Sequence, residues 1–288
     1  MPIHDVSYRH WQGTRSNRPP SFVLGAAQLR VALRRRGVRV LLLVSGLFVI
    51  AYLGILYLET MPREGALGFL RDIPFVSLDG RTMKFFLMRQ RLLQYMLCLA
   101  AGAEVIALDR RYRALQIYLA RPLRVPDYLA GKAVPMLLLL SLVTWVPAIL
   151  LLVLKSVATA SLEWLRDEPH LPFAIMGYST LLVVSLTSLT LAVSSMTSSP
   201  RLASGQLVAV LLLPMAAADI LTGLTHNDNW RLLSLDSLLD QVCSWMFRAE
   251  PPYELSPWAA LVMLFLMIAG AIALLLRRVR AVDVVGGS

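Results

Sequence analysis

The sequence has little of what catalytic and metal centres are built from. It contains two cysteines, Cys98 in an apolar run and Cys243 in a distant loop, so it predicts no disulfide framework. Four histidines are scattered without the spacing of metal ligands. A glycine-rich phosphate loop, a Gly-x-Ser-x-Gly turn and a His-Glu-x-x-His helix are all missing. We therefore predict no catalytic residue, no metal ligand and no cofactor-binding residue in this chain, and no enzymatic activity of its own.

Apolar residues, by contrast, are abundant. They make up 57% of the chain, and the mean hydropathy is +0.63, which is typical of an integral membrane protein. The net charge of +10 could indicate a nucleic-acid partner. Most of the cations flank apolar runs, however, where they contact anionic lipid and set topology. We expect membrane lipid as a partner and no nucleic acid.

Six apolar runs are long enough to cross a bilayer as helices of roughly 20 residues each. They cover residues 40–58, 86–107, 132–154, 172–195, 201–223 and 257–276. We predict an all-α integral membrane protein with six transmembrane helices. Residues 1–20 would form a cytosolic arm without the features of a cleaved signal peptide, and residues 21–288 a single transmembrane domain.

Two further segments are predicted to be helical outside the spans. Residues 21–39 have clustered cations before the first apolar run, which favours an amphipathic helix in the membrane interface. Residues 224–256 are expected to form an external helical segment. Its apolar face would comprise Leu232, Leu235, Leu239, Val242 and Met246, and its opposite face Ser234, Ser237, Asp240, Gln241 and Ser244. This pattern predicts a helix that lies on or dips into the outer surface.

Charges and prolines inside the spans carry three more expectations. Arg89 and Arg91 are expected to extend to the interface, and Pro135 and Pro147 predict kinks in the third span. An even number of spans places both termini on one side. Because the segments on that side carry most of the 28 Lys and Arg residues, we predict that both termini and residues 109–131 are cytoplasmic.

The most distinctive stretch is D-R-R-Y-R-A-L-Q-I-Y-L-A-R-P-L-R-V-P-D-Y-L-A-G-K, residues 109–132. Helical spacing places Leu108, Tyr112, Leu115 and Leu119 on one face of a first helix that ends near Ala120. Pro126 and Asp127 favour the start of a second helix. A topology anchor would explain the charge, but it needs no pair of proline-punctuated helices. We interpret the stretch as a bent cytosolic docking element.

Four polar residues inside the spans are candidate functional groups. Glu104 would be an acid or base, or would simply pair with Arg110, Arg111 or Lys132, which we favour. Asp219 is expected near the outer end of its span, where it reaches water. Thr180 and Thr187 follow one seam of the fourth span with Ser194, and such seams more often serve helix packing than a substrate path.

Residues 109–132 resemble the stretch after the second span of ABC-2 type transporter permeases, D-R-R-x-x-A-L-x-x-Y-L-x-R-P-L-x-x-x-D-Y-x-x-G-K. The matching positions are Asp109, Ala114, Leu115, Tyr118, Arg121, Pro122, Asp127, Tyr128, Gly131 and Lys132. The resemblance implies a six-span subunit that pairs with a second permease half, identical or related. It also implies two cytosolic ABC ATPase subunits, which bind ATP and Mg, and a coupling element at residues 109–131.

The function hypothesis follows from this resemblance. We expect a multi-pass permease subunit in the plasma membrane, a bacterial inner membrane, exporting a hydrophobic, lipid-linked or drug-like substrate by alternating access. The expected ATPase-docking and coupling residues are Asp109, Arg110, Arg111, Arg113, Tyr118, Arg121, Pro122, Arg124, Asp127 and Lys132. Two alternatives stay open: an integral-membrane lipid-modifying enzyme that uses Glu104, and a non-transporting membrane scaffold.

Overall fold

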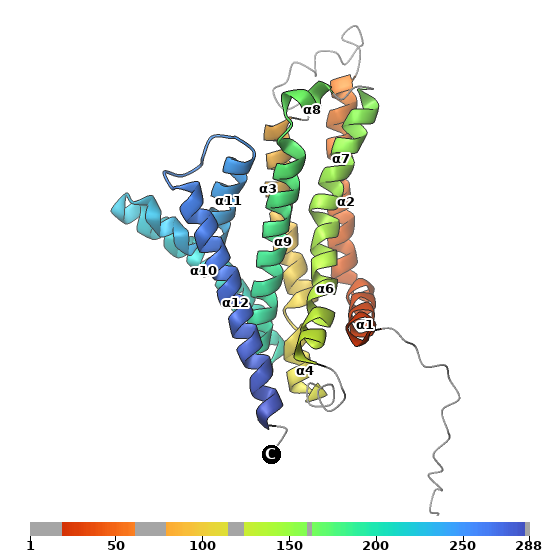
Figure 1. Cartoon of the computed structure of the whole chain (residues 1–288), viewed down its shortest axis with the longest axis vertical. Helices are drawn as coiled ribbons and strands as arrows, with labels where there is room; N and C mark the ends of the chain where they lie inside the picture. Colours follow the sequence, from red (N-terminus) through yellow and green to blue (C-terminus); the bar gives the residue numbers. More distant parts are fainter. Residues whose placement is uncertain (1–18, 61–78, 115–123, 160–162, 286–288) are drawn as a thin grey trace, which may run out of the picture.

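The computed structural model of the chain describes residues 19–60, 79–114, 124–159 and 163–285, and every regular element in these ranges is a helix. Long helices run side by side in Figure 1, while α10 and α12 diverge from them towards one end. That end carries α8 and is called the α8 end. The opposite end, called the α4 end, carries α4, α1 and the C-terminal end of α12.

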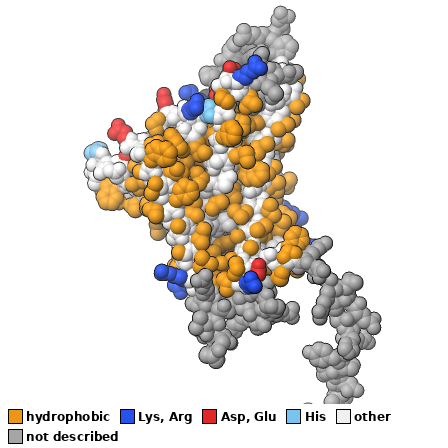
Figure 2. All heavy atoms as spheres, in the orientation of Figure 1, with side chains coloured by type: hydrophobic (Ala, Val, Ile, Leu, Met, Phe, Trp, Pro, Cys, Tyr) orange, Lys and Arg blue, Asp and Glu red, His pale blue; other side chains and the backbone are white. Residues whose placement is uncertain are grey.

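Six helical segments are long and apolar enough to cross a membrane, which confirms the six spans expected from the sequence. They are α2 (Arg36–Thr60), α3 (Gly80–Leu97) continued through α4 to Arg111, α6 with α7 (Val125–Ala158), α9 (Leu171–Met196), α10 (Pro200–Thr225) and α12 (Pro257–Val285). Between and before them lie α1 (Pro20–Arg34), α8 (Glu163–Asp167), η3 (Asp228–Leu233) and α11 (Leu235–Met246). Figure 2 shows a broad apolar band between charged groups at the two ends, as a membrane-spanning bundle requires.

Helix α9 is the centre of the bundle. It packs against α4, α6, α7, α10, α11 and α12, and most of its residues are buried. Small side chains allow this close packing: a Cβ on Gly102 would lie 2.5 Å from Thr190 Cγ2 of α9. Helices α2 and α10 lie at the edges, and few of their residues are buried within the chain.

Proline breaks one of the long spans. Pro147 has no amide hydrogen to donate to the carbonyl four residues earlier, and the span is interrupted at Thr144, between α6 (Val125–Val143) and α7 (Trp145–Ala158). The Thr144 hydroxyl donates to the Leu140 carbonyl at this break. Pro135, by contrast, lies inside an uninterrupted α6 and faces Gly25 of α1.

Helix α1 lies against the α4 end of α6. Figure 1 shows α1 nearly end-on beside the upright α6, so the two helices cross. Their approach is close, because a Cβ on Gly131 would lie 2.8 Å from Leu24 Cδ2. The chain then turns at Arg35 and continues as α2. We call this turn at Arg35 the α1–α2 elbow, and the contact of α1 with α6 holds it against the bundle.

Helix α11 corrects an expectation. Its polar residues Ser237, Asp240, Gln241 and Ser244 were expected to avoid the buried face, yet all four are buried. They are buried because neighbouring segments supply partners. Asp240 pairs with Arg91, and Gln241 donates to the backbone carbonyls of Tyr253 and Leu255.

Candidate functional site

The basic end of the second span is anchored to α9. The helix widens into a π-helical turn, η2 (Cys98–Gly102), before α4 (Val105–Arg111) begins. The Ser194 hydroxyl of α9 accepts hydrogen bonds from the amides of Ile106 and Ala107 at 2.9 and 3.2 Å. These amides belong to the first turn of α4, which has no acceptor within its own helix. A movement of α4 would therefore be transmitted to α9 through these hydrogen bonds.

A buried ion pair joins α4 to α6. Lys132 Nζ lies 2.6 Å from Asp109 Oδ2, and the Tyr128 hydroxyl donates to the same oxygen at 2.7 Å. Both charged side chains are largely withdrawn from water, at 8% and 14% exposure. We call Asp109, Tyr128 and Lys132 the latch. Asp109 and Lys132 were expected among the docking residues; their charges instead face each other.

Glu104 is held by the α1–α2 elbow. Its Oε2 lies 3.4 Å from Arg35 Nη2, and Arg35 also donates to the Ala100 carbonyl at 2.8 Å. The expectation that Glu104 pairs with Arg110, Arg111 or Lys132 is therefore wrong. It failed because Lys132 of α6 pairs with Asp109 and Arg110 donates to the Ser195 carbonyl. Arg35, 69 positions before Glu104, reaches the π-helical turn and its carboxylate instead.

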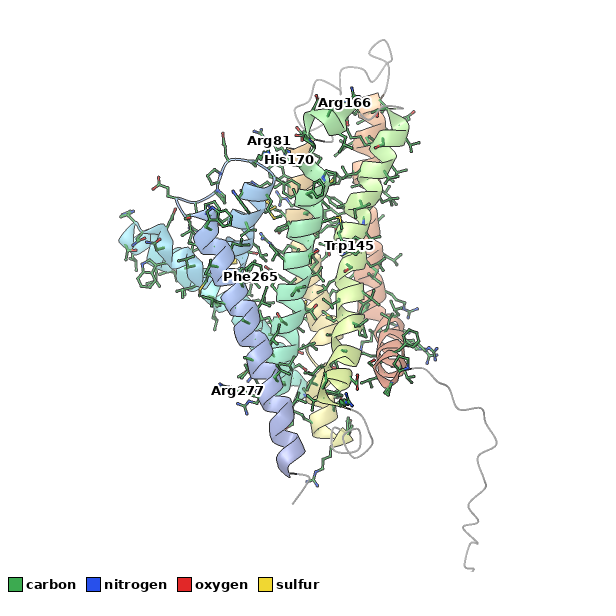
Figure 3. All side chains as sticks on the ribbon, in the orientation of Figure 1. Arg81, Trp145, Arg166, His170, Phe265 and Arg277 are labelled. Atoms are coloured by element: carbon green, nitrogen blue, oxygen red, sulfur yellow. The ribbon has the colours of Figure 1, made fainter. Side chains whose placement is uncertain are left out.

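Exposed cations remain at the end of α4 and immediately before α6. Arg111, Arg113 and Arg124 are exposed, and we call these three residues the basic surface. Arg110 is instead half-buried and donates to the Ser195 carbonyl of α9. Figure 3 places Arg277 of α12 at this same end, and Arg81, Arg166 and His170 at the other.

The local structure of residues 109–114 differs from the expectation, while the expected helix end near Ala120 lies outside the described residues. The first helix does not continue through Tyr112, because α4 ends at Arg111 and Arg113 adopts a left-handed backbone with φ of 53°. Tyr112, expected to share a helical face with Leu108, is 69% exposed. The second helix does begin near Pro126, with Asp127 in its first turn, but it is continuous with the third span. Tyr118, Arg121 and Pro122 lie outside the described residues.

The remaining candidate polar groups do not gather in one place. Thr180 is exposed and donates to the Met176 carbonyl, whereas Thr187 is buried and its hydroxyl has no partner among the described residues. Asp219 is half exposed and pairs with Arg231 at 2.9 Å, as expected for a carboxylate near water. Within the described ranges, no group of three His, Cys, Asp or Glu side chains could hold a metal ion.

Sequence reasoning missed a charged cluster near the α8 end. Arg91 was expected at the interface, but it is buried and bridges two carboxylates of α11, Asp236 at 2.9 Å and Asp240 at 2.6 Å. Tyr95 donates to Asp236 at 2.8 Å. Burial raises the pKa of Asp240, and the Arg91 guanidinium opposes this effect. We call Arg91, Tyr95, Asp236 and Asp240 the α11 cluster. The signal available in the sequence was the spacing of Asp236 and Asp240, which places two acids on one face of a helix.

The structure thus combines six spans with a basic helix tip after the second span. Contacts tie the region of this tip to α9, to α6 and to the α1–α2 elbow. Residues 30–284 match the family described as ABC-2 family transporter protein. This protein belongs to that family. No curated protein matches the chain. As an ABC-2 family permease it is a multi-pass membrane protein and a transport component, and members of this family normally work with ABC ATPase partners.

Proposed function

We propose that this ABC-2 family permease is driven by cytosolic ABC ATPase subunits that bind at the α4 end. In this proposal, ATP hydrolysis moves α4, and the movement opens and closes a passage that exports a hydrophobic, lipid-linked or drug-like substrate. The observation that supports it is the attachment of α4. Its tip carries exposed cations, and its body is held by Ser194 of α9, by the latch to α6 and by Glu104 to Arg35.

This attachment determines how force would travel. A push on the basic surface would reach α6 through the 2.6 Å Asp109–Lys132 pair, because a short ion pair withdrawn from water resists separation. It would reach the α1–α2 elbow through Glu104 and Arg35. Helices α6 and α9 and the elbow would then move with α4, which is what alternating access requires of a six-span half.

The proposal includes a second permease half and two ATPase subunits, which bind ATP and Mg. The exposed apolar faces of α2 and α10 offer surface both to lipid and to a second half. Both termini and the basic surface would be cytoplasmic, and the membrane a bacterial inner membrane. The even number of spans and the cations at the α4 end support this orientation.

Charge reversal tests ATPase docking. Arg111→Glu combined with Arg124→Glu should abolish co-purification of a co-expressed ABC ATPase, because like charges replace attraction. Raising the salt concentration should weaken the wild-type complex, since exposed charges are screened. Arg81→Glu combined with Arg166→Glu is the matched control, with two exposed arginines changed at the α8 end. Equal co-purification of both double variants would contradict the proposal.

Cysteine labelling tests the orientation. Cys98 and Cys243 are both fully buried, and burial raises the pKa of the Cys243 thiol to about 12, so the native protein should react little with maleimide. Arg166→Cys should then be labelled in intact cells, and Arg111→Cys only after permeabilisation. The reverse pattern would place the basic surface outside the cell and remove the basis for ATPase docking.

A further inference from the structure

A pocket of about 690 Å³ opens near the α8 end, between the start of α9, the end of α11 and the start of α12. Its volume is within the usual range for small-molecule sites. His170 immediately precedes α9, and Pro257 is the first residue of α12, so the pocket lies where two spans leave the apolar band. The rings of Trp245 and Trp258, 5.1 Å apart at their centroids, lie at this level, as aromatic residues do at membrane interfaces.

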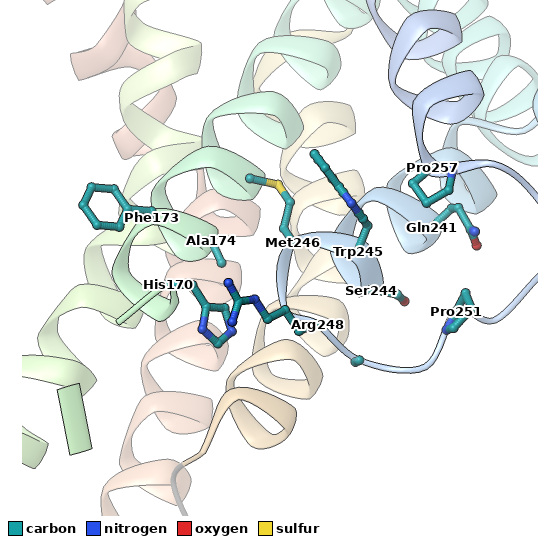
Figure 4. Close-up of a pocket in the computed structure, with 11 residues that line it drawn as sticks. His170, Phe173, Ala174, Gln241, Ser244, Trp245, Met246, Arg248, Pro251 and Pro257 are labelled. Carbon is teal, nitrogen blue, oxygen red and sulfur yellow. The ribbon is translucent and has the colours of Figure 1, made fainter. Parts of the chain in front are cut away.

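Two residues that line the pocket have polar atoms without hydrogen-bond partners. Both ring nitrogens of His170 are buried and have no hydrogen-bond partner among the described residues. Oε1 of Gln241, a residue only 1% exposed, is likewise unpartnered, although its amide nitrogen donates to two backbone carbonyls. Buried polar atoms without partners are costly, so a ligand or water is expected to satisfy them. Figure 4 shows His170 and Arg248 reaching towards the same side of the pocket.

The charge of this side is positive. Arg248 is exposed, and among the described residues it forms no ion pair. The nearest acids along the chain do not neutralise it. Glu250 is exposed and does not line the pocket, and the Glu168 carboxylate accepts a hydrogen bond from the Gly80 amide at 3.1 Å. A guanidinium beside an imidazole suits a phosphate group.

The pocket also has an apolar surface. Phe173, Trp245, Met246 and Pro257 line it, and Phe173 and Trp245 are substantially exposed. We propose that the pocket binds an anionic phospholipid. The phosphate-bearing head group would contact Arg248 and His170, and the acyl chains would lie along the apolar surface. The site is separate from the basic surface and does not depend on how transport is energised.

Native mass spectrometry of the purified full-length protein tests this inference with phosphatidylglycerol as the probe. Arg248→Gln should weaken binding about tenfold, because a charge-assisted hydrogen bond is lost. His170→Gln should weaken it less. Arg166→Gln is the matched control, since Arg166 is an exposed arginine at the same end that does not line the pocket, and it should leave binding unchanged. Unchanged thermal unfolding of each variant establishes that the loss is local.

Competition distinguishes the source of the phosphate. Phosphatidylcholine should bind more weakly than phosphatidylglycerol, and inorganic phosphate should displace the lipid poorly, because it has no acyl chain for the apolar surface. Brominated phosphatidylglycerol should quench tryptophan fluorescence, and Trp245→Phe should reduce that quenching. Equal lipid binding by Arg248→Gln and Arg166→Gln would overturn the inference. So would displacement by millimolar inorganic phosphate, which would indicate a free-anion site.

Discussion

The two ends of the bundle use charge differently. At the α4 end, the latch neutralises one lysine with one aspartate, and the arginines of the basic surface remain exposed. Near the α8 end, the α11 cluster sets one arginine against two aspartates, and this set is buried between α3 and α11. At the α4 end, positive charge remains available to a partner. Near the α8 end, the arginine is fully paired, and its ion pairs hold the short helix α11 inside the bundle.

This difference separates contacts that transmit movement between helices from contacts that only stabilise the fold. A buried ion pair adds little stability over a well-packed apolar pair, but removing one partner is strongly destabilising. The α11 cluster therefore makes α11 a fixed part of the fold. The latch has the same chemistry but adjoins an exposed tip, so its loss should affect coupling as well as stability. Three substitutions test whether the two sets of charges differ in this way.

The largest effect is expected for Arg91→Met. It leaves two carboxylates without their shared cation, and we expect it to lower the free energy of unfolding by about 3–5 kcal/mol, measured by denaturation in mixed micelles. Arg89→Met is the control, because Arg89 is an exposed arginine of the same helix. Adding Asp236→Asn and Asp240→Asn should restore part of the loss. Equal stability of Arg91→Met and Arg89→Met would contradict a holding role.

A smaller loss is expected for Lys132→Met. Asp109 keeps the Tyr128 hydroxyl as a donor, so we expect a loss of about 2–3 kcal/mol in the same assay. ATPase co-purification should persist while transport falls, because the basic surface is intact but α4 is no longer tied to α6. Arg124→Met serves as the control that should leave stability unchanged. Full transport by Lys132→Met would show that the latch is structural only.

The smallest effect is expected for Asp219→Asn. The Asp219 side chain is 52% exposed, and Arg231 retains Asp228 at 3.3 Å and the Tyr253 ring at 4.1 Å. An exposed ion pair contributes about 0–1 kcal/mol, so unfolding should shift by no more than this. A shift as large as that of Arg91→Met would mean that exposure does not rank these charges, and the comparison between the two ends would fail.

The spans were predictable because their signal is local. Hydropathy along roughly 20 residues identifies a helix that can cross a bilayer, and all six runs became such helices. The break near Pro147 and the helix start near Pro126 were predictable for the same reason, since proline acts on its own neighbours. The end of α4 was not, because Arg113 leaves the helical conformation without a glycine or proline to signal it.

The site was predictable only in part. The exposed arginines of the basic surface follow from their positions beside an apolar run. The partners of Glu104 and Arg91 do not, because Arg35 and Asp236 lie 69 and 145 positions away in the chain. Helical periodicity also misjudged α11. Its polar residues indicated a helix on the outer surface, but Asp240 faces Arg91 and Gln241 faces the carbonyls of Tyr253 and Leu255.

Hydropathy and charge act over short stretches of chain, so they were sufficient to predict a six-span membrane bundle with a basic tip after its second span. Which charges remain unpaired depends on contacts between distant segments. Asp109 is matched by Lys132 and Arg91 by the acids of α11, whereas Arg111 and Arg248 have no ion-pair partner within the described residues. The reason is physical: burial makes an unpaired charge costly, so the packing of distant segments selects the pairs.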